Sequence, residues 1–331
     1  MVSIKRWNEP EKFWDLVEEW TALLKSLNYQ NAFMTSCWLG LTYDYFAKDE
    51  ELNLFEIRDE ASRLVGIIPL VASRVNGEVT IEFPSWHGFG HYDFIIDQKH
   101  RNESISEMLR LMRGNYVGES VHLRLGPMMS ISPNIWPLEK SLKEMGIGME
   151  KEEVATLPYL ELPGSMDELI LSLKPADRKK FTRWVKRAHR LADMEILRVN
   201  KPQEMDSALD KLFHMMQLLG KEVDLGVEAF LRESARVLSN RGAFEIFYLK
   251  ADSWPVAVAV VMKFDSVVHI LIEDVDPEAM GVQAGAVLFV HIVETAISEG
   301  MKRIEILDEI EGFSIASLKE SPLYILKADM N

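Results

Sequence analysis

Residues 273–308 read EDVDPEAMGVQAGAVLFVHIVETAISEGMKRIEILD, and this stretch decides the fold. The apolar run Val267–Glu273, which leads into it, predicts a strand, and a turn-rich loop follows. Val287–Glu299 predicts an amphipathic helix, and Met301–Asp308 alternates as a strand does. The stretch therefore predicts a strand, a glycine-containing loop, a helix and a second strand.

The loop between the strand and the helix holds two glycines, Gly281 and Gly285, among other small residues. A helix that begins after such a loop has several unpaired backbone N–H groups at its start, and its dipole adds partial positive charge there. This arrangement suits a pyrophosphate, which the backbone can bind without basic side chains. Ordinary turns between strands and helices also carry glycine, so a purely structural turn is the alternative.

The composition excludes several classes of protein. The chain has 331 residues, 47% hydrophobic and 27% charged, which is typical of a globular protein with two domains. A net charge of −15 argues against general binding to nucleic acids. The single cysteine, Cys37, cannot form an intramolecular disulfide and fits a reducing compartment. No signal peptide or membrane-spanning segment is expected, so we expect a cytoplasmic protein without membrane insertion.

Both halves of the chain predict the same order of elements: helices, three consecutive strands, a helix and a strand. In the first half these are Glu9–Leu27, Ser36–Ala47, Leu52–Arg58, Arg63–Ser73, Val79–Phe83, Ile105–Arg113 and Ser120–Leu125. In the second half they are Pro202–Leu219, Val227–Asn240, Ala243–Lys250, Pro255–Phe264, Ser266–Glu273, Val287–Glu299 and Lys302–Leu307. We therefore predict two domains, residues 1–150 and 151–331, with a ligand cleft between them.

The segment 165–191 predicts a long basic helix that bridges the two halves. Between Ser172 and Arg190 it contains eight basic residues and one acidic residue, and its apolar positions form a separate stripe. Exposed helices usually mix charges of both signs, so this run indicates a face that binds an anion. The candidate ligands are the phosphates of coenzyme A, an acidic or nucleotide-linked substrate, or an RNA acceptor stem. The alternative is a solvated charged face.

Five short motifs follow one another along most of the chain: Phe33–Leu39, Leu64–Leu70, Leu173–Leu191, Val256–Ala259 and Gln283–Asp308. Each motif is degenerate, and their order along one chain is the specific part. In this order they resemble the GNAT-type acyltransferases, in the branch described as BioF2-like or CelD-like, which is related to the FemAB peptidyltransferases.

This resemblance implies tandem GNAT-like domains of the α/β (α+β) class, each with a mixed, mostly antiparallel central sheet flanked by helices. It also implies acetyl-CoA or another acyl-CoA as co-substrate. We expect no metal, because His87 and His91 have no third ligand at a convincing spacing. The pyrophosphate would lie at the loop 281–287, on Gln283, Ala284, Gly285, Ala286 and Val287. Family members carry more glycines in this turn, where this chain has Ala284 and Ala286.

Acyl transfer to an amine requires a base with a pKa near neutral and good positioning of the two reactants. Glu273 and Asp274 end the strand before the loop, and Asp308 ends the following strand. We predict Glu273 and Asp308 as catalytic candidates, with His269 expected on the same face as Glu273. Tyr324 is the candidate acid for the leaving thiolate. The alternative is that the strand-end acids cap neighbouring helices.

Residues 86–93, WHGFGHYD, form an aromatic loop that resembles the family segment carrying a Tyr-Asp pair at the interdomain cleft. Rings for stacking and polar groups for orientation suit a sugar or a peptide. The loop could instead fill the domain interface. Lys319 resembles the lysine of the family's Tyr-Lys motif, although the aromatic residue is missing here. The predicted substrate-binding residues are Trp86, His87, Tyr92, Asp93, Arg178, Lys179, Arg183 and Lys319.

The sequence therefore predicts an N-acyltransferase that moves an acyl group from acyl-CoA to an amine of a small or glycan-linked acceptor in the interdomain cleft. The alternatives are a Fem-like peptidyltransferase that uses aminoacyl-tRNA and a non-catalytic GNAT-like binding protein. Nucleic acid is a partner only under the first of these alternatives. The sequence does not fix the acceptor, the acyl chain length or the oligomeric state.

Overall fold

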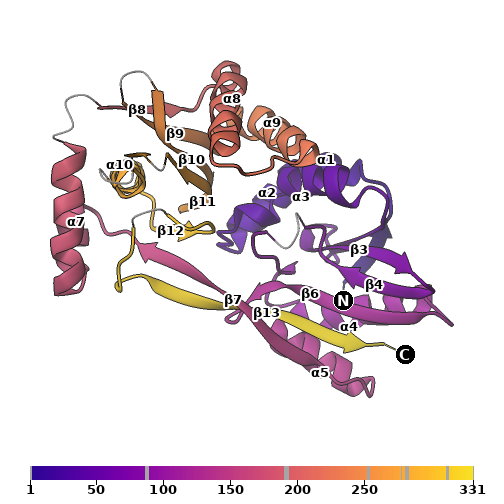
Figure 1. Ribbon diagram of the computed structural model, residues 1–331. Helices are drawn as coiled ribbons and strands as arrows, with labels where there is room; N and C mark the ends of the chain where they lie inside the picture. Colours follow the sequence, from indigo (N-terminus) through magenta and orange to yellow (C-terminus); the bar gives the residue numbers. More distant parts are fainter. Residues whose placement is uncertain are drawn as a thin grey trace. The chain divides into compact units, whose positions relative to one another are not determined.

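The computed structural model describes residues 2–85, 89–189, 194–251, 254–276, 278–279, 283–310 and 313–330. The chain forms two compact units (Figure 1). The first comprises Met1–Thr156 and Ser321–Asn331, and the second comprises Leu157–Glu320. The division predicted from sequence placed the whole C-terminal segment in the second domain, whereas the structure assigns residues 321–331 to the first unit.

The sheet of the first unit has the strand order β1-β2-β3-β4-β6-β13. Neighbours are antiparallel except for β4 and β6, which are parallel. The short strand β5 pairs with β3. Six strands are β1 Ser3–Trp7, β2 Glu51–Arg58, β3 Leu64–Val75, β4 Glu78–Glu82, β5 Ile95–Ile96 and β6 Ser120–Met129, and the C-terminal strand is β13 Lys319–Asp329.

The helices of the first unit are short except for α4, which connects the parallel strands β4 and β6. They are α1 Lys12–Asp15, α2 Val17–Ser26, η1 Ala32–Met34, α3 Ser36–Thr42, the π-helical turn η2 Tyr43–Ala47, α4 Arg101–Asn115 and α5 Ile135–Glu144. The apolar side chains of Phe13, Trp20 and Trp38 are fully buried, which shows that α1, α2 and α3 help to form the core.

The second unit repeats this plan. Its sheet runs β8-β9-β10-β11-β12, and the end of β7 pairs with β12. All of these neighbours are antiparallel except β11 and β12, which are parallel. The strands are β7 Glu150–Glu161, β8 Met194–Val199, β9 Phe244–Ala251, β10 Trp254–Phe264, β11 Val267–Val275 and β12 Arg303–Ile306.

Helices cover both faces of the second sheet (Figure 1). They are α6 Met166–Ser172, α7 Pro175–Ala188, α8 Pro202–Leu218, α9 Leu225–Ser239 and α10 Ala284–Ser298. The helix α10 packs on β9, β10 and β11 and also contacts α7, while α8 contacts β8, β10, β11 and α9. The core between α10, α7 and the sheet includes Phe181, Trp184, Val287 and Phe289.

The fold class predicted from sequence is confirmed. In each unit, helices precede an antiparallel run of strands, and a single helix then crosses to a parallel strand. The equivalent crossovers are β4-α4-β6 and β11-α10-β12. This is the strand–helix–strand unit that residues 273–308 predict.

The prediction of one continuous helix over 165–191 is wrong, because the two helices α6 and α7 occupy this segment. Between α6 and α7, Leu173 (φ −69°, ψ 152°) and Lys174 (φ −57°, ψ 147°) have extended backbone. Pro175 explains the break, because a proline disfavours helical geometry in the residue before it and is well placed to start the next helix. Within the described residues, none of the helices combines the length and hydrophobicity that a membrane crossing requires.

Candidate functional site

The parallel strands β11 and β12 separate at one end. Their ladder runs from Val267 opposite Arg303 to Ile270 opposite Ile306, and the N–H of Leu307 then donates to the carbonyl oxygen of Ile270 at 3.0 Å. The strand β11 continues to Val275, and residues 271–275 have no partner on β12 among the described residues. Residues 271–275 of β11 therefore extend beyond β12, on the side of β11 where β12 pairs with residues 267–270.

A β-bulge lies at the start of this separated segment. On β10, Val260 is opposite Ile272 and Val261 is opposite Ile270, so Leu271 is the extra residue. The bulge changes which face each side chain takes. Glu273 lies opposite Ala259 and His269 lies opposite Met262, three positions away, so the two side chains take opposite faces.

The expectation that His269 shares a face with Glu273 is therefore wrong. The side chain of His269 is fully buried, and its Nδ1 lies 2.9 Å from Oε2 of the equally buried Glu305, its neighbour on β12.

Two of the predicted catalytic residues meet at the separated end. The Asp308 carboxylate accepts hydrogen bonds from the backbone N–H of Glu273 at 3.2 Å and from that of Glu309 at 2.9 Å. Glu273 is buried and Asp308 is half-buried. Tyr324 lies on β13 in the first unit, opposite Met128.

A third carboxylate, Asp274, lies on the opposite face of β11 from Glu273. Its Oδ1 contacts the ammonium group of Lys221, which lies between α8 and α9. The Asp274 side chain is only 1% exposed, and its Oδ2 has no hydrogen-bond partner among the described residues. An orphaned carboxylate oxygen in a buried position is costly, so it marks a position where a ligand proton or water could bind.

Burial raises the pKa of the Asp274 carboxyl, while Lys221 acts in the opposite direction and Asp308 raises it further. Burial tends to lower the pKa of Lys221, but the contact with Asp274 and the charges of Asp308 and Glu273 raise it overall. Sequence reasoning noticed Asp274 at the strand end but missed Lys221, because a single lysine in a helix connection carries no local signal.

The start of α10 differs from the predicted turn. Gln283 is the N-cap residue and takes the left-handed conformation (φ 57°, ψ 49°), whereas Gly285 lies in the first helical turn. Ala284, Gly285, Ala286 and Val287 are all buried. Of the predicted acyl-CoA loop 281–287, residues 281 and 282 lie outside the described residues. The burial of Gly285 means that a large side chain there would disturb packing as well as any ligand.

The side chain of Gln283 turns toward α7 and does not cap its own helix. Its Oε1 accepts hydrogen bonds from Nε1 of Trp184 and from Nη1 of Arg187, both at 3.1 Å. The first backbone bond of α10 runs from Val287 to Gln283, so the N–H groups before it have no acceptor within the helix. An uncapped helix start beside a guanidinium fits an anionic group such as a pyrophosphate.

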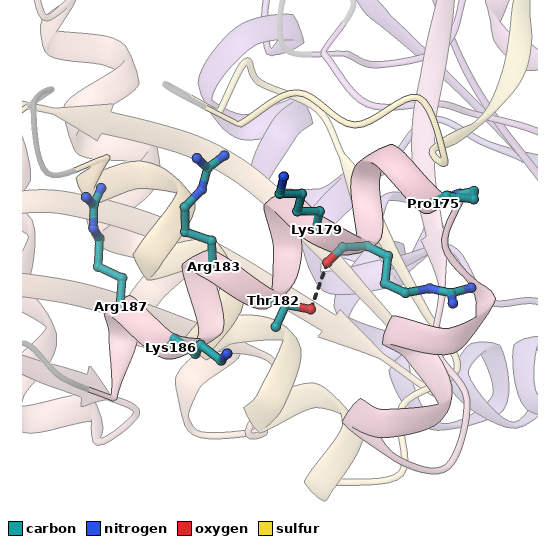
Figure 2. A pocket seen from close by; sticks show the side chains of 7 residues that line it. Pro175, Lys179, Thr182, Arg183, Lys186 and Arg187 are labelled. Carbon is teal, nitrogen blue, oxygen red and sulfur yellow. Dashed lines mark hydrogen bonds between the residues drawn. The ribbon is translucent and has the colours of Figure 1, made fainter.

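The basic residues of α7 have different roles. The guanidinium of Arg178, predicted to bind substrate, donates to the carbonyl oxygens of Ile170 at 3.1 Å, Leu171 at 2.7 Å and Leu173 at 3.3 Å. It therefore caps α6. Lys179 and Arg183, predicted for the same role, are exposed and line an open groove of about 680 Å³ along α7 (Figure 2).

The remaining predicted substrate residues are spread over the chain. Tyr92 is fully buried in the first unit, where its hydroxyl donates to the carbonyl oxygen of Phe89 at 2.7 Å. Asp93 is buried and accepts from Nδ2 of Asn134 at 2.7 Å, and burial raises the pKa of its carboxyl. Trp86 and His87 lie outside the described residues. In the second unit, Lys319 is exposed and its Nζ lies 6.0 Å from the ring centre of Tyr159.

Comparison with known proteins identifies the second unit. Residues 176–313 match the family model described as an acetyltransferase (GNAT) domain. This part of the chain is similar to a GNAT domain. The matched residues begin in α7 and include β11, α10 and β12, and hence Lys221, the three strand-end carboxylates and the start of α10. The predicted relationship to GNAT-type proteins is confirmed at this level. No curated protein matches the sequence significantly.

Solved structures extend the likeness of fold to nearly the whole chain. The structure of FemX has a TM-score of 0.66 at 10% identity and covers 94% of this chain and 95% of its own. A conserved protein of unknown function from Bacteroides thetaiotaomicron has a TM-score of 0.62 at 12% identity and covers 100% of both chains. The C-terminal domain of a putative lysylphosphatidylglycerol synthetase from Agrobacterium fabrum has a TM-score of 0.55 at 11% identity and covers 96% of this chain and 92% of its own.

Proposed function

We propose that the protein is an N-acyltransferase that moves an acyl group from acyl-CoA to an amine of a small or glycan-linked acceptor. The observation that carries this proposal is the separated end of β11 and β12. There residues 271–275 of β11 extend beyond β12, beside three carboxylates. The GNAT-type domain gives the reaction class, and the geometry supports the residues that would perform it.

The donor, acyl-CoA, would bind through the amide groups of its pantetheine arm and through its pyrophosphate. The pantetheine arm of coenzyme A contains amide groups, which can pair with the part of β11 that extends beyond β12, as an added strand does. The pyrophosphate would lie at the start of α10, where Gln283 leaves the N–H groups uncapped and Arg187 adds positive charge. Gln283 would act here through its backbone, because its side chain is bound to Trp184 and Arg187.

In the proposed reaction, the amine nitrogen of the acceptor attacks the thioester carbon, a base removes the proton of the amine, and the thiolate leaves. We propose Asp274 as this base, because its Oδ2 has no partner among the described residues and burial raises its pKa toward a useful range. Lys221 would hold the other oxygen. Glu273 and Asp308, proposed from the sequence, are the competing candidates. Tyr324 as the acid for the thiolate, and the acceptor residues Trp86, His87, Tyr92, Asp93 and Lys319, stay predictions.

The first experiment is calorimetric titration of the protein with acetyl-CoA, longer acyl-CoAs and free coenzyme A. We expect saturable binding, and a ligand at a hundred times its Kd should add about 2.7 kcal/mol to the stability of the fold. Release of free thiol in the presence of a panel of amines then reports turnover. Binding of none of these thioesters would contradict the proposed donor.

The same assay assigns the base. We expect Asp274→Asn to lower kcat by at least about 100-fold with little change in the Kd of the donor. Asn keeps the size of the side chain and can still accept from Lys221, so it is a conservative replacement. If Glu273→Gln lowers kcat more than Asp274→Asn does, Glu273 is the base instead.

A second candidate is transfer of an aminoacyl group from tRNA, as the resemblance to the FemAB peptidyltransferases implies. The likeness of fold to FemX favours it. Binding of charged tRNA with a strong dependence on salt, in the absence of acyl-CoA binding, would select this alternative. A binding protein without activity would bind a donor and show no turnover with any amine.

A further inference from the structure

Six of the seven basic side chains of α7 and its N-cap fall into two groups, and the seventh, Lys186, is exposed and also lines the open groove. Lys174 and Lys180 donate to the carbonyl oxygens of Ala316 and Ser314, and Arg178 caps α6. Arg187 binds Gln283 at the start of α10. These four cations hold the helix against neighbouring segments of the second unit, so their charges have a structural use.

Lys179 and Arg183 are different, because neither has an ion-pair or hydrogen-bond partner among the described residues. Both are exposed, and both line the open groove of about 680 Å³. Figure 2 shows their side chains rising from the same side of the helix as that of Arg187. Residues 179, 183 and 187 are spaced by four, so they form one continuous row about 12 Å long.

Two adjacent cations without acidic partners repel each other and destabilise the helix. The chain has an excess of acidic residues, with a net charge of −15, so it could easily have supplied partners. The row also ends at a defined place, because Arg187 is bound to the N-cap residue of α10. The positive row therefore leads from the open groove to the uncapped helix start.

We propose that Lys179 and Arg183 form a phosphate-binding subsite that takes the phosphates of a small polyphosphate ligand. This proposal rests on the proposed function in one respect, namely that the ligand is the phosphate-bearing end of the acyl donor bound at α10. Lysine and arginine are the usual partners of phosphate oxygens, and the guanidinium of arginine can bind two oxygens at once.

The lining of the groove favours a small ligand over RNA. Its residues are Pro175, Arg178, Lys179, Thr182, Arg183, Lys186 and Arg187, and none of these is aromatic. Proteins that bind single-stranded nucleic acids usually stack bases on aromatic rings, and binding to a duplex requires a long series of phosphate contacts. In the row formed by residues 179, 183 and 187, two cations without a partner among the described residues and one anchored arginine match a short run of phosphates.

The test uses inorganic tripolyphosphate as the probe and compares three proteins by calorimetry. These are the wild type, Lys179→Glu with Arg183→Glu, and Lys140→Glu with Lys143→Glu. The control changes two exposed lysines on α5, in the first unit, and so alters the net charge by the same amount. We expect the α7 variant to bind tripolyphosphate at least about tenfold more weakly than the control. Equal affinity of the two variants, or no binding by the wild type, would overturn the proposal.

Competition then identifies the source of the phosphates. Displacement of tripolyphosphate by coenzyme A, and less well by coenzyme A that lacks its 3′-phosphate, would support the donor. Displacement by tRNA alone would support the phosphate subsite and assign it to RNA. The proposed function and this inference fail separately: equal binding of coenzyme A by the α7 variant and the control overturns only the subsite. Binding of tripolyphosphate without binding of acyl-CoA contradicts only the donor.

Discussion

The carboxylate of Asp308 accepts a hydrogen bond from the backbone N–H of Glu273, at 3.2 Å, across the point where β11 and β12 separate. The same carboxylate accepts from the N–H of Glu309 at 2.9 Å. Asp308 therefore serves the backbone of both segments. Two roles are open to Asp308: it can stabilise the backbone of these segments, and it can act as the catalytic base.

Substitution of Asp308 separates these roles. Asp308→Ala removes the acceptor of two backbone N–H groups, and we expect it to lower the free energy of unfolding by about 1–3 kcal/mol. Asp308→Asn keeps one carbonyl oxygen and should cost less. Urea denaturation measures the stability, and turnover measures the role. If Asp308 only stabilises the backbone, Asp308→Asn keeps most of the activity. A loss of activity of about 100-fold or more would instead assign Asp308 to proton transfer.

The contact between Lys221 and Asp274 predicts a change in the dependence of activity on pH. The charge of Lys221 holds the pKa of Asp274 below the value that burial and Asp308 alone would give. Lys221→Met therefore raises this pKa, and a base that must be deprotonated then needs a higher pH. We expect the acidic limb of the kcat/KM profile to move to higher pH.

Lys201→Met is the control for this prediction, because Lys201 pairs with Glu204 on the exposed surface. Its acidic limb should coincide with that of the wild type. A lower rate in Lys221→Met without movement of the acidic limb would mean that Asp274 is not the base.

The left-handed N-cap residue of α10 predicts that two small substitutions differ in their effect on stability. Gln283→Ala removes the acceptor of the buried Trp184 Nε1 and keeps the strained backbone, so we expect a loss of about 1–3 kcal/mol in stability. Gln283→Gly loses the same hydrogen bond but relieves about 1 kcal/mol of backbone strain. Thermal unfolding of the two variants should place the glycine variant higher. The reverse order would show that the left-handed backbone carries no strain.

Substitution of Arg178 is expected to lower the stability of the protein without weakening phosphate binding. Arg178→Met keeps the alkyl chain and removes the donors to three carbonyl oxygens at the end of α6, for a cost of about 1 kcal/mol. We expect Tm to fall by about 2 °C and the Kd for tripolyphosphate to change less than about twofold. A large change in Kd with unchanged Tm would show that Arg178 binds the ligand, as the sequence predicted.

Glu50 predicts a dependence of stability on pH in the first unit. Burial and the nearby charge of Glu82 raise the pKa of its carboxyl to about 7, from an ordinary value of 4.5. The folded state thus binds more protons than the unfolded state between these values, and stability falls as pH rises through this range. Glu50→Gln should therefore be more stable than the wild type at pH 8, by on the order of 1 kcal/mol once solvent screening is allowed for, and no more stable at pH 4. Equal denaturation midpoints at pH 8 would contradict this assignment.

The sequence predicted the secondary structure of the second unit well, because the periodicity of apolar residues there is strong. The helix predicted from Pro202 ends within one residue of its observed end, and the strands on either side of α10 lie where alternation placed them. Pro175 indicates a helix break, but the continuous run of basic residues favoured a single helix, so the break was not predicted. Strands β1, β7, β8 and β13 were missed, since they pair with segments that lie far away along the chain.

The site was predicted less completely for a physical reason. Residues near in sequence, such as Glu273 and the start of α10, could be grouped because one strand–helix connection holds them. The pairing of Asp274 with Lys221 depends on how α8 packs on the sheet, and periodicity carries no information about that. The bulge at Leu271 reversed the expected face of His269, because a single extra residue changes the alternation of every side chain after it.

The assignment of residues 321–331 to the first unit has a consequence for biosynthesis. The ribosome makes β6 before the second unit, but β13, which pairs with β6, only after it. Until then, the β13-facing edge of β6 lacks its native partner, and such an edge can pair with other chains. In the nascent first unit, this edge of β6 therefore stays without its native partner while the whole of the second unit is translated.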